Sequence, residues 1–520
     1  MWFLLLLVLL VLLYCYLTRN HDYWEKRNVK HVRPIPFFGN MYRNVMGIES
    51  TTELSTKMYN KYPNEKVIGV YHGTTPELHI RDLELVRRIL NVDFAYFYPR
   101  GLGRHPKEEP VFENLFHVDG DIWRLLRQRI TPAFTNAKLK KMFPLVIDCA
   151  EKLQDVVEDI VNRGGECDVR ELMARFTTEF IAACGFGLQV DSIKNENSAF
   201  RKFGIQIFSR NRSWQNIAIV VLYNLLPDFR PLIQKLLGDT EMLATTKDIV
   251  QSVLTQRNNK PSGRHDFIDL LLEMAEKGKI TGESIEKRNP DGSPVQVEKE
   301  MDLDCMVAQV FIFFAAGFET SSSATSFLLH ELAYNPEEQK KVQGDIDRVL
   351  AKYDNKMCYD SIAEMTALSM AFKESMRKFP SLGTLNRVCA KRYNIPELGI
   401  TIDPGVKIVI PLQAIQTDEK YFEDPLQFKP ERFADTSAER NKYSYMPFGE
   451  GPRMCVGARL GEMQSLAGLV AVLQKFTVEP GPASKKELEV SHISNIVQSI
   501  KVYLNISVNT LNIFFLSNLY

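Results

Sequence analysis

A glycine-rich turn near the C-terminal end of the chain carries a single cysteine directly before a long helical pattern. The residues PFGEGPRMCVG occupy positions 447–457, and an apolar stretch follows at once. Cys455 is therefore expected at a helix N-terminus, where unpaired backbone amides and the helix dipole favour a thiolate. The glycines let the backbone approach a bulky group. Arg453 has a planar fork that suits a carboxylate.

The residues of this turn leave two interpretations open. A lone free cysteine is more often a small buried hydrophobe than a ligand. The chain has 8 cysteines without a CxxC pair, so neither a zinc site nor a disulfide framework is indicated. With Arg453 beside it, Cys455 also suits a haem, the sulfur binding the iron and the guanidinium a propionate. A formal net charge of +0 and the lack of a charged tail argue against a nucleic-acid partner.

The order of helical and strand-like segments predicts a mainly α fold with a small β region. Residues 66–82 are expected to form a hairpin, and the pattern from about 120 to 375 is mainly helical. Residues 286–300 are expected to form a loop because of their charge, proline and glycine. Residues 405–415 return to strand character. The strand–helix alternation of a doubly wound sheet is not seen.

The N-terminus is the strongest shift in composition. Residues 2–17 carry no charge, and basic residues follow them. We interpret residues 1–18 as a transmembrane signal anchor that leaves the rest of the chain in the cytosol. A cleaved signal peptide is the alternative, although no small-residue cleavage site follows. The expected order is then a basic, Pro-rich linker (19–40), a main domain (41–505) and an atypical apolar tail (506–520).

The turn at Cys455 resembles the FxxGxRxCxG haem-binding signature of the cytochrome P450 superfamily at every fixed position. The resemblance implies that haem b lies between an oxygen-binding helix and the cysteine-bearing loop, and that residues 41–505 are a haem-thiolate catalytic domain. It implies that Cys455 is the axial ligand of the haem iron. Phe448, Gly449 and Arg453 are implied haem contacts.

Two upstream segments resemble a second feature of the family. KESMR (373–377) supplies Glu374 and Arg377, and FKPERF (428–433) supplies Arg432. Residues three apart on a helix share a face, so Glu374 and Arg377 can pair. The resemblance implies that the three residues form the family's buried structural network behind the haem.

Further arginines resemble the propionate contacts of the family. The segment DGDIWRLLRQRITPAF (119–134) matches WxxxR at Trp123 and Arg127, and Arg387 follows Arg377 by ten residues. The resemblance implies that Trp123, Arg127 and Arg387 contact the haem. Taken singly, an arginine on a helix is usually solvated.

The apolar run FFAAGFETSSSATSFLLHEL (313–332) resembles the oxygen-binding helix of the family. Ala316 and Gly317 remove bulk beside a flat cofactor and are implied haem neighbours. Glu319 and Thr320 form an acid–alcohol pair that is implied to deliver protons. The alternative is a buried helix that uses glycine and serine for close packing.

The positions of the family's substrate-contacting segments suggest a set of pocket residues. They are Phe112, Phe116, Phe311, Ala315, Leu382 and Thr384. Apolar walls favour a lipophilic small molecule. Near the C-terminus the family usually has a hairpin with glycines at its tip, and residues 494–520 contain none. Because this hairpin usually closes the substrate pocket, we expect the substrate selectivity of this chain to differ from that of typical family members.

The resemblance implies a monooxygenase that draws electrons from NADPH indirectly. The expected partner is NADPH–cytochrome P450 reductase, with cytochrome b5 as a second candidate, at the endoplasmic reticulum membrane. Lysines in NAKLKKMFP (136–144), Arg440 and Lys442 are candidate reductase contacts or ordinary solvated residues. The phrases RKFPSLGTLNR and TDEKYFEDPLQFKPERF look most like microsomal, insect-type, xenobiotic-metabolising members.

Two other functions remain open at this point. The first is a haem-thiolate enzyme that rearranges peroxides or isomerises without a reductase. The second is a non-enzymatic protein that binds haem or hydrophobic molecules. The Glu319–Thr320 pair argues against both, because proton delivery serves oxygen activation.

Overall fold

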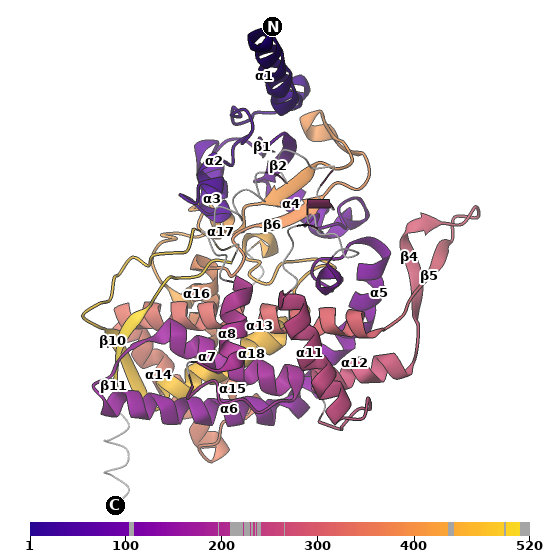
Figure 1. The fold of residues 1–520 in the computed structure, drawn as a ribbon. Coiled ribbons are helices and arrows are strands. Elements are labelled where there is room, and N and C mark those ends of the chain that lie inside the picture. The colour runs from indigo at the N-terminus through magenta and orange to yellow at the C-terminus, as the bar shows by residue number, and fades with distance from the viewer. Residues whose placement is uncertain are drawn as a thin grey trace, which may run out of the picture.

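The computed structural model describes residues 1–102, 109–195, 197–208, 222, 229, 232–233, 236, 241–264, 266–434, 441–492, 494 and 496–509. The α-helices are α1 (Trp2–Thr18), α2 (Tyr42–Val45), α3 (Thr51–Lys61), α4 (Leu83–Arg87), α5 (Gly120–Ile130), α6 (Asn136–Asn162), α7 (Val169–Ile181), α8 (Ala199–Phe208), α11 (Glu241–Gln256), α12 (Phe267–Glu276), α13 (Leu303–Tyr334), α14 (Pro336–Leu350), α15 (Tyr359–Glu364), α16 (Thr366–Lys378), α17 (Leu412–Gln416) and α18 (Ala458–Leu473). The strands are β1 (Val67–His72), β2 (Thr75–Ile80), β3 (Glu166–Asp168), β4 (Ile280–Arg288), β5 (Pro294–Lys299), β6 (Leu385–Val388), β7 (Tyr393–Ile395), β8 (Ile400–Ile402), β9 (Lys407–Ile410), β10 (Phe476–Pro480) and β11 (Tyr503–Val508). The predicted mainly α fold with a small β region is confirmed (Figure 1).

The helix α13 runs through the middle of the helical body, beside α7 and α18 (Figure 1). Its 32 residues are apolar on most sides, and most of its side chains are buried. It is long and apolar enough to cross a membrane by length and composition, but burial inside the protein marks it as a core helix. The Asp302 side chain accepts a hydrogen bond from the Cys305 amide and begins the helix.

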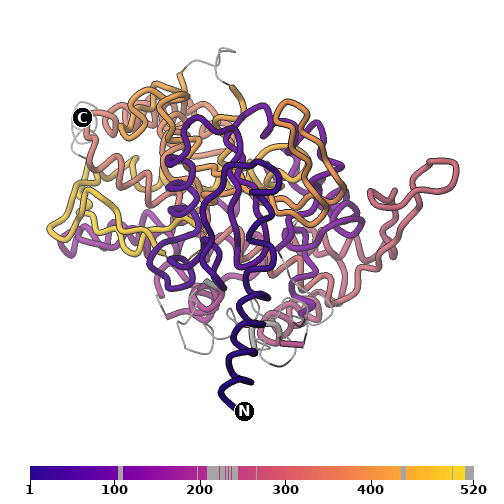
Figure 2. Tube along the Cα trace, turned by 90° about the horizontal axis from the view of Figure 1, so that it is seen from above, coloured from indigo at the N-terminus to yellow at the C-terminus, as the bar shows by residue number. Residues whose placement is uncertain are grey.

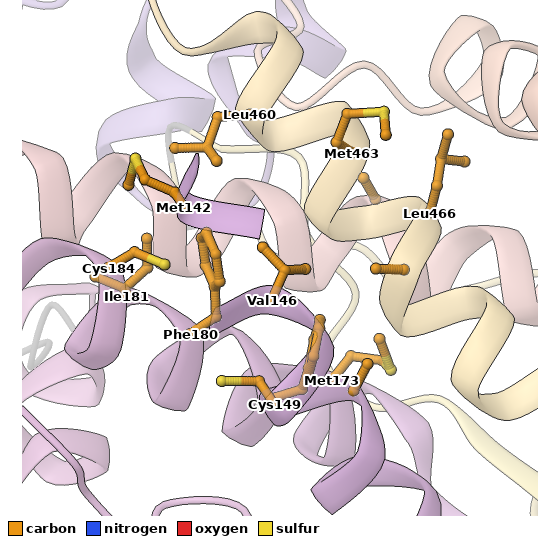
Figure 3. Close-up of a cluster of buried hydrophobic side chains, with 14 of the residues drawn as sticks. Met142, Val146, Cys149, Met173, Phe180, Ile181, Cys184, Leu460, Met463 and Leu466 are labelled. Atoms are coloured by element: carbon orange, nitrogen blue, oxygen red, sulfur yellow. The ribbon is translucent and has the colours of Figure 1, made fainter. Parts of the chain in front are cut away.

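The helix that follows the cysteine loop, α18, packs on α6 and α7 through apolar side chains (Figure 3). Leu460, Met463 and Leu466 of α18 belong to the same cluster as Cys149 of α6. Burial raises the pKa of the Cys149 thiol to about 12, so it remains a neutral, apolar group. This core holds α18 in place, and with it the cysteine loop that precedes α18.

The main sheet has the strand order β1–β2–β9–β6, on the side of the molecule that carries α1 (Figure 1). The predicted hairpin of residues 66–82 is the antiparallel pair β1–β2. Residues 405–415 form a strand only as far as Ile410, because Pro411 precedes the short helix α17. A second sheet has the order β10–β11–β3, and it pairs β11, near the C-terminus, with β3 of residues 166–168.

The prediction of a loop at residues 286–300 is wrong. The strands β4 and β5 form an antiparallel hairpin that projects from the body (Figures 1 and 2). Both faces of this hairpin are largely polar, so it lacks the alternation that identifies a half-buried strand. Its base is fixed by Asp121, whose carboxylate accepts hydrogen bonds from the Ser284 hydroxyl at 2.8 Å and the Ile285 amide at 2.7 Å.

The N-terminal helix α1 stands away from the body with its side chains exposed (Figures 1 and 2). The following residues 19–40 are docked on the protein by Trp24, which is fully buried. The Trp24 indole donates a hydrogen bond of 3.0 Å to the Val70 carbonyl of β1. The region 19–40 therefore sets α1 at a defined place beside the main sheet.

The C-terminal segment turns back on itself without glycine. The Ser491 amide donates to the Gln498 carbonyl at 2.8 Å, and the Ile500 amide donates to the Glu489 carbonyl at 2.8 Å. The chain then enters β11, which continues to Val508. Of the apolar tail expected at 506–520, residues 510–520 lie outside the described residues.

Candidate active site

The cysteine loop is held by its own backbone. The Cys455 amide donates to the Phe448 carbonyl at 2.8 Å, which closes the turn. Gly449 and Gly451 have φ values of 73° and 77°, the left-handed region that favours glycine. At Gly451 a Cβ atom would lie 1.9 Å from the Leu90 carbonyl oxygen, so no other residue fits there.

The loop lines a partly open cavity of about 590 Å³, whose wall α13 also lines. Cys455 is exposed to this cavity while protein atoms surround it. Burial therefore raises the pKa of its thiol, and the Gly457 amide, Arg127 and Arg100 act in the opposite direction. A bound metal ion would displace the thiol proton, because the thiolate is the form that binds metals.

Four arginines reach the wall of the cavity beside the cysteine: Arg100, Arg127, Arg387 and Arg453. Arg453 donates to the Asp119 carboxylate at 2.7 Å and lies over the Trp123 ring, 4.2 Å from its centroid. Burial lowers the pKa of Arg453 to about 9 and that of Arg100 to about 10. The described residues supply no carboxylate within ion-pair distance of Arg127 or Arg387.

Two of these guanidinium groups have a buried nitrogen without a partner in the described structure. They are the Nε atoms of Arg387 and Arg453. Burial and the neighbouring Arg100 and Arg453 hold the pKa of Arg387 well below its usual value. Buried, unpaired positive charge is costly unless an anion joins it. The cavity wall therefore fits a ligand that carries carboxylates, and a sulfur donor lies beside them.

Arg100 was not identified from the sequence. Its Nη2 donates to the Arg453 carbonyl at 3.0 Å, and its Nη1 donates to the Phe116 carbonyl at 2.9 Å. It lies in irregular chain between two short helices, far in sequence from the cysteine loop. No local pattern marks it, so only the assembled fold brings it to the site.

The predicted Glu374–Arg377–Arg432 network is present in the structure. Arg377 donates to both oxygens of Glu374, at 2.8 Å and 2.9 Å, and both side chains have 0% exposure. Arg432 lies 3.3 Å from Glu374. Arg377 also donates to the Gln416 carbonyl at 2.8 Å and so ties α16 to α17.

Thr320 and Glu319 of α13 point in different directions. Thr320 lines the cavity, and its hydroxyl donates to the Ala316 carbonyl at 2.6 Å. Glu319 is buried outside the cavity lining, 2.5 Å from Arg170 of α7 and 3.2 Å from the Ser323 hydroxyl. Burial raises the pKa of Glu319, and Arg170 acts against that rise.

Ala316 and Gly317 line the cavity as expected. A Cβ atom at Gly317 would lie 2.3 Å from the Ile181 side chain of α7. The missing side chain thus serves close packing of α13 on α7 as well as the cavity. Gly317 therefore fits both interpretations of this helix, the oxygen-binding helix and the closely packed buried helix.

The six predicted pocket residues divide into two groups. Phe116, Leu382 and Thr384 line the cavity. Phe112, Phe311 and Ala315 are buried and lie outside its lining, and the Phe112 and Phe311 rings pack together with centroids 6.1 Å apart. The sequence could not distinguish these faces of α13, because the helix is apolar on most sides.

Other lining residues were missed. Phe313 of α13 stacks on Phe267 of α12 with ring centroids 4.4 Å apart. Both rings line the cavity, as does Gln309. The Gln309 amide holds the preceding segment against α13 by hydrogen bonds of 3.0 Å to the Glu113 carbonyl and the Leu115 amide.

A helical body with a thiol in a glycine-rich loop, arginines that fit carboxylates and an apolar cavity indicates a protein of the haem-thiolate class. Comparison with known proteins gives the same result. A family model described as Cytochrome P450 matches residues 30–504. The chain therefore belongs to the cytochrome P450 family, and it is a cytochrome P450 monooxygenase.

Several similar proteins are insect members of the family. Cytochrome P450 6B6 of Helicoverpa armigera is 36% identical over 484 residues, which cover 93% of each chain. Cytochrome P450 6B1 of Papilio polyxenes is 36% identical over 484 residues, 92% of this chain and 94% of the relative. Probable cytochrome P450 6a18 of Drosophila melanogaster is 33% identical over 505 residues, 95% of this chain and 96% of the relative.

Proposed function

We propose that this chain oxidises a lipophilic small molecule at a haem b held by Cys455. The observation that carries the proposal is the meeting of a thiol, a cluster of partly unpaired arginines and Thr320 on one largely apolar cavity. Xenobiotics, plant toxins, insecticides and endogenous lipids share the required lipophilic character. The reaction incorporates one atom of dioxygen into the substrate.

The haem, when bound, supplies oxygen activation and electron transfer that side chains cannot perform. Cys455 would hold its iron, and Arg453, Arg387, Arg127 and Arg100 would neutralise its carboxylates. Phe448, Gly449 and Trp123 would enclose it, since all three line the cavity beside the thiol. The Glu374–Arg377–Arg432 network would hold α16 and the chain around residue 430 in register behind the site.

Thr320 and Glu319 have separate tasks in this scheme. The Thr320 hydroxyl is already on the cavity wall and can pass a proton to the cavity side. Glu319 lies outside the cavity lining and is paired with Arg170, so it would reach the cavity by rotation of its side chain away from Arg170. Because burial raises its pKa, Glu319 holds a proton to higher pH than an exposed glutamate and is suited to release it.

The electrons would come from NADPH through NADPH–cytochrome P450 reductase, with cytochrome b5 as a second donor. Lys138 and Lys141 remain candidate contacts for an acidic partner. Lys140 lies 2.7 Å from Asp360 and Lys442 lies 2.8 Å from Glu450, so these charges are already paired. Arg440 lies outside the described residues.

The endoplasmic reticulum membrane is the proposed location, with the catalytic domain on the cytosolic side. The exposed apolar helix α1 supports this proposal. Its 17 residues span about 26 Å at 1.5 Å per residue, close to the thin hydrocarbon layer of that membrane.

The test is the carbon monoxide difference spectrum of the reduced protein in membranes, beside Cys455→Ser. A strongly red-shifted Soret band that the variant lacks is expected for a thiolate-bound haem. NADPH consumption upon addition of reductase then separates an oxygenase from an isomerase or a binding protein. A band at the position of histidine-bound haem, or none, would refute the proposal.

A further inference from the structure

A buried polar corner lies on the wall of the same cavity. It is formed by Ser55 of α3 with Glu77 and His79 of β2, and all three line the cavity. Their side chains are almost fully buried, with 2%, 5% and 3% exposure respectively. We call these three residues the β2 corner. Polar groups at this depth require partners.

His79 is a neutral ring with one nitrogen bonded and one unbonded. Its Nδ1 lies 3.3 Å from the Ser55 hydroxyl oxygen, while its Nε2 is buried without a hydrogen-bond partner in the described structure. Burial lowers the pKa of His79 to about 4, so the ring is uncharged near neutral pH. The Glu77 carboxylate facing Nε2 favours the tautomer with the ring proton on Nε2, and in that tautomer the Ser55 hydroxyl donates to Nδ1.

Glu77 is ionised although it is buried. Burial favours its neutral form, but Lys407 and His72 outweigh this effect and lower its pKa to about 2. Lys407 and His72 each lie 3.5 Å from Oε1 of Glu77. The other oxygen, Oε2, lies 4.0 Å from His79 Nε2, which is too long for a hydrogen bond.

We propose that the β2 corner binds a hydroxyl group of an otherwise lipophilic substrate, between His79 Nε2 and Glu77 Oε2. An oxygen placed about 2.8 Å from both atoms accepts from the ring N–H and donates to the carboxylate. A hydroxyl has both a donor and an acceptor. A ketone lacks the donor and an ammonium group lacks the acceptor. The proposal rests on the proposed function, because it assigns one end of the substrate that reacts at the haem.

The charge around the corner also favours a neutral group. Lys407 stands opposite Glu77 in the parallel pair of β9 and β2, and it balances the carboxylate. A cationic ligand would meet Lys407 as a like charge. The hydroxyl therefore fits the corner better than an amine.

The arrangement does not resemble a nucleophilic triad. In a triad the serine bonds one ring nitrogen and the carboxylate bonds the other, both at hydrogen-bond distance. Here the carboxylate stands 4.0 Å away from the ring. Ser55 is thus a positioning residue that holds the His79 ring through Nδ1, while the nearby Glu77 carboxylate favours the ring proton on Nε2.

The corner is connected to the reacting end of the cavity. Thr52 of α3 touches the turn at Gly383, where a Cβ atom would lie 2.1 Å from the Thr52 side chain. Leu382 and Thr384 on either side of Gly383 line the same cavity as Cys455. A long substrate bound at the corner would therefore pass this turn on its way to the haem.

The experiment uses probes with an imidazole at one end, which binds haem iron, and an alkyl chain of graded length. Each chain ends in a methyl, a hydroxyl, a methyl ketone or an ammonium group. Affinity is measured by the Soret shift of the membrane-bound holoprotein. We expect one chain length at which the hydroxyl binds about ten-fold tighter than the methyl, as for a hydrogen bond to a charged group. The ketone and ammonium probes should show no such gain.

The variants are His79→Leu and Glu77→Gln, with His330→Leu as the matched control. His330 is also buried but bonds the Lys486 carbonyl outside the cavity lining. The hydroxyl gain should vanish in His79→Leu, shrink in Glu77→Gln and persist in His330→Leu. An equal gain in His79→Leu, or no gain at any length in the unaltered protein, would overturn the proposal.

The carbon monoxide spectrum of each variant separates this proposal from the proposed function. A normal red-shifted band together with lost hydroxyl preference supports the β2 corner alone. Absence of that band in the unaltered protein refutes the haem site itself. Should His79→Leu fail to fold, Ser55→Ala tests the same tautomer, and it should weaken the hydroxyl gain while the methyl probe binds unchanged.

Discussion

Arg170 of α7 lies 2.5 Å from Glu319 of α13, and neither residue lines the cavity. The next residue, Thr320, lines the cavity. Arg170 also donates to the Gln498 side chain at 3.0 Å, so the C-terminal turn supports the ion pair. Of the acid–alcohol pair of α13, only the alcohol thus lines the cavity, and the acid has a partner that it must leave.

Replacement of Arg170 by leucine should shift the pH dependence of turnover. Arg170 holds the pKa of Glu319 down against burial, so its loss raises that pKa further. The protonated acid then persists to higher pH, and the limb of the turnover profile that depends on Glu319 moves to higher pH. NADPH-supported turnover across pH measures this shift, with the exposed Arg163→Leu as the control. An unchanged profile would mean that Glu319 does not take part.

Replacement of Glu374 by glutamine should prevent formation of a stable haem protein. Arg377 would then be a buried cation without its carboxylate, and Arg432 would lose the same partner. Removal of one member of a buried pair costs about 3–5 kcal/mol. The measurement is the yield of the carbon monoxide band and the thermal midpoint. The exposed pair of Glu431 and Lys341 at 2.6 Å offers the control, for which Glu431→Gln should cost about 1 kcal/mol or less.

Replacement of Arg387 by methionine should speed the loss of haem. No carboxylate of the described residues pairs with Arg387, and its Nε is buried without a partner, so a propionate is its expected counter-charge. Loss of a charge-assisted hydrogen bond of about 1.5–3 kcal/mol corresponds to about ten-fold or more in rate. Transfer of haem to excess apomyoglobin measures it. The control is Arg124→Met, which removes only an ion pair with the exposed Glu283. This variant should transfer haem at the unaltered rate.

Replacement of His79 by glutamine should flatten the acid side of the stability profile. The folded-state pKa of about 4 lies below the ordinary value of 6.5, so the unfolded chain binds a proton that the folded chain does not. Stability is therefore full above pH 6.5 and falls as the pH drops from 6.5 towards 4. The loss between pH 7 and pH 5 amounts to about 2 kcal/mol. Thermal midpoints at both pH values should differ less in the variant, and an equal difference in both proteins would show that folding does not lower the pKa of His79.

The sequence was most informative where function depends on neighbouring residues. The turn that holds Cys455 closes on Phe448 within a few residues, and Glu374 pairs with Arg377 one helical turn away. Such features have local signatures, because the spacing alone places the groups together. The mainly α fold was predictable for the same reason, since helical periodicity is a local property.

The rest of the site comes from distant segments. Arg100 meets the Arg453 backbone, Arg170 meets Glu319, and Ser55 meets His79, each through packing that no spacing encodes. The face of α13 that meets the cavity was equally hidden, because its apolar residues surround the helix. The β4–β5 hairpin escaped because its two polar faces give no alternation.

The strand β3 pairs, among the described strands, with β11 alone, so that residues 166–168 meet residues 503–505. Ribosomes make the chain from its N-terminus, and β3 must wait beside α7 until nearly all of the protein has been synthesised. Gln498, which supports Arg170, arrives in the same late stretch. A chain released early would therefore have its cysteine loop, but the sheet at the edge of the helical body would lack β11 (Figure 1). The ion pair of Arg170 and Glu319 would also lack its contact with Gln498.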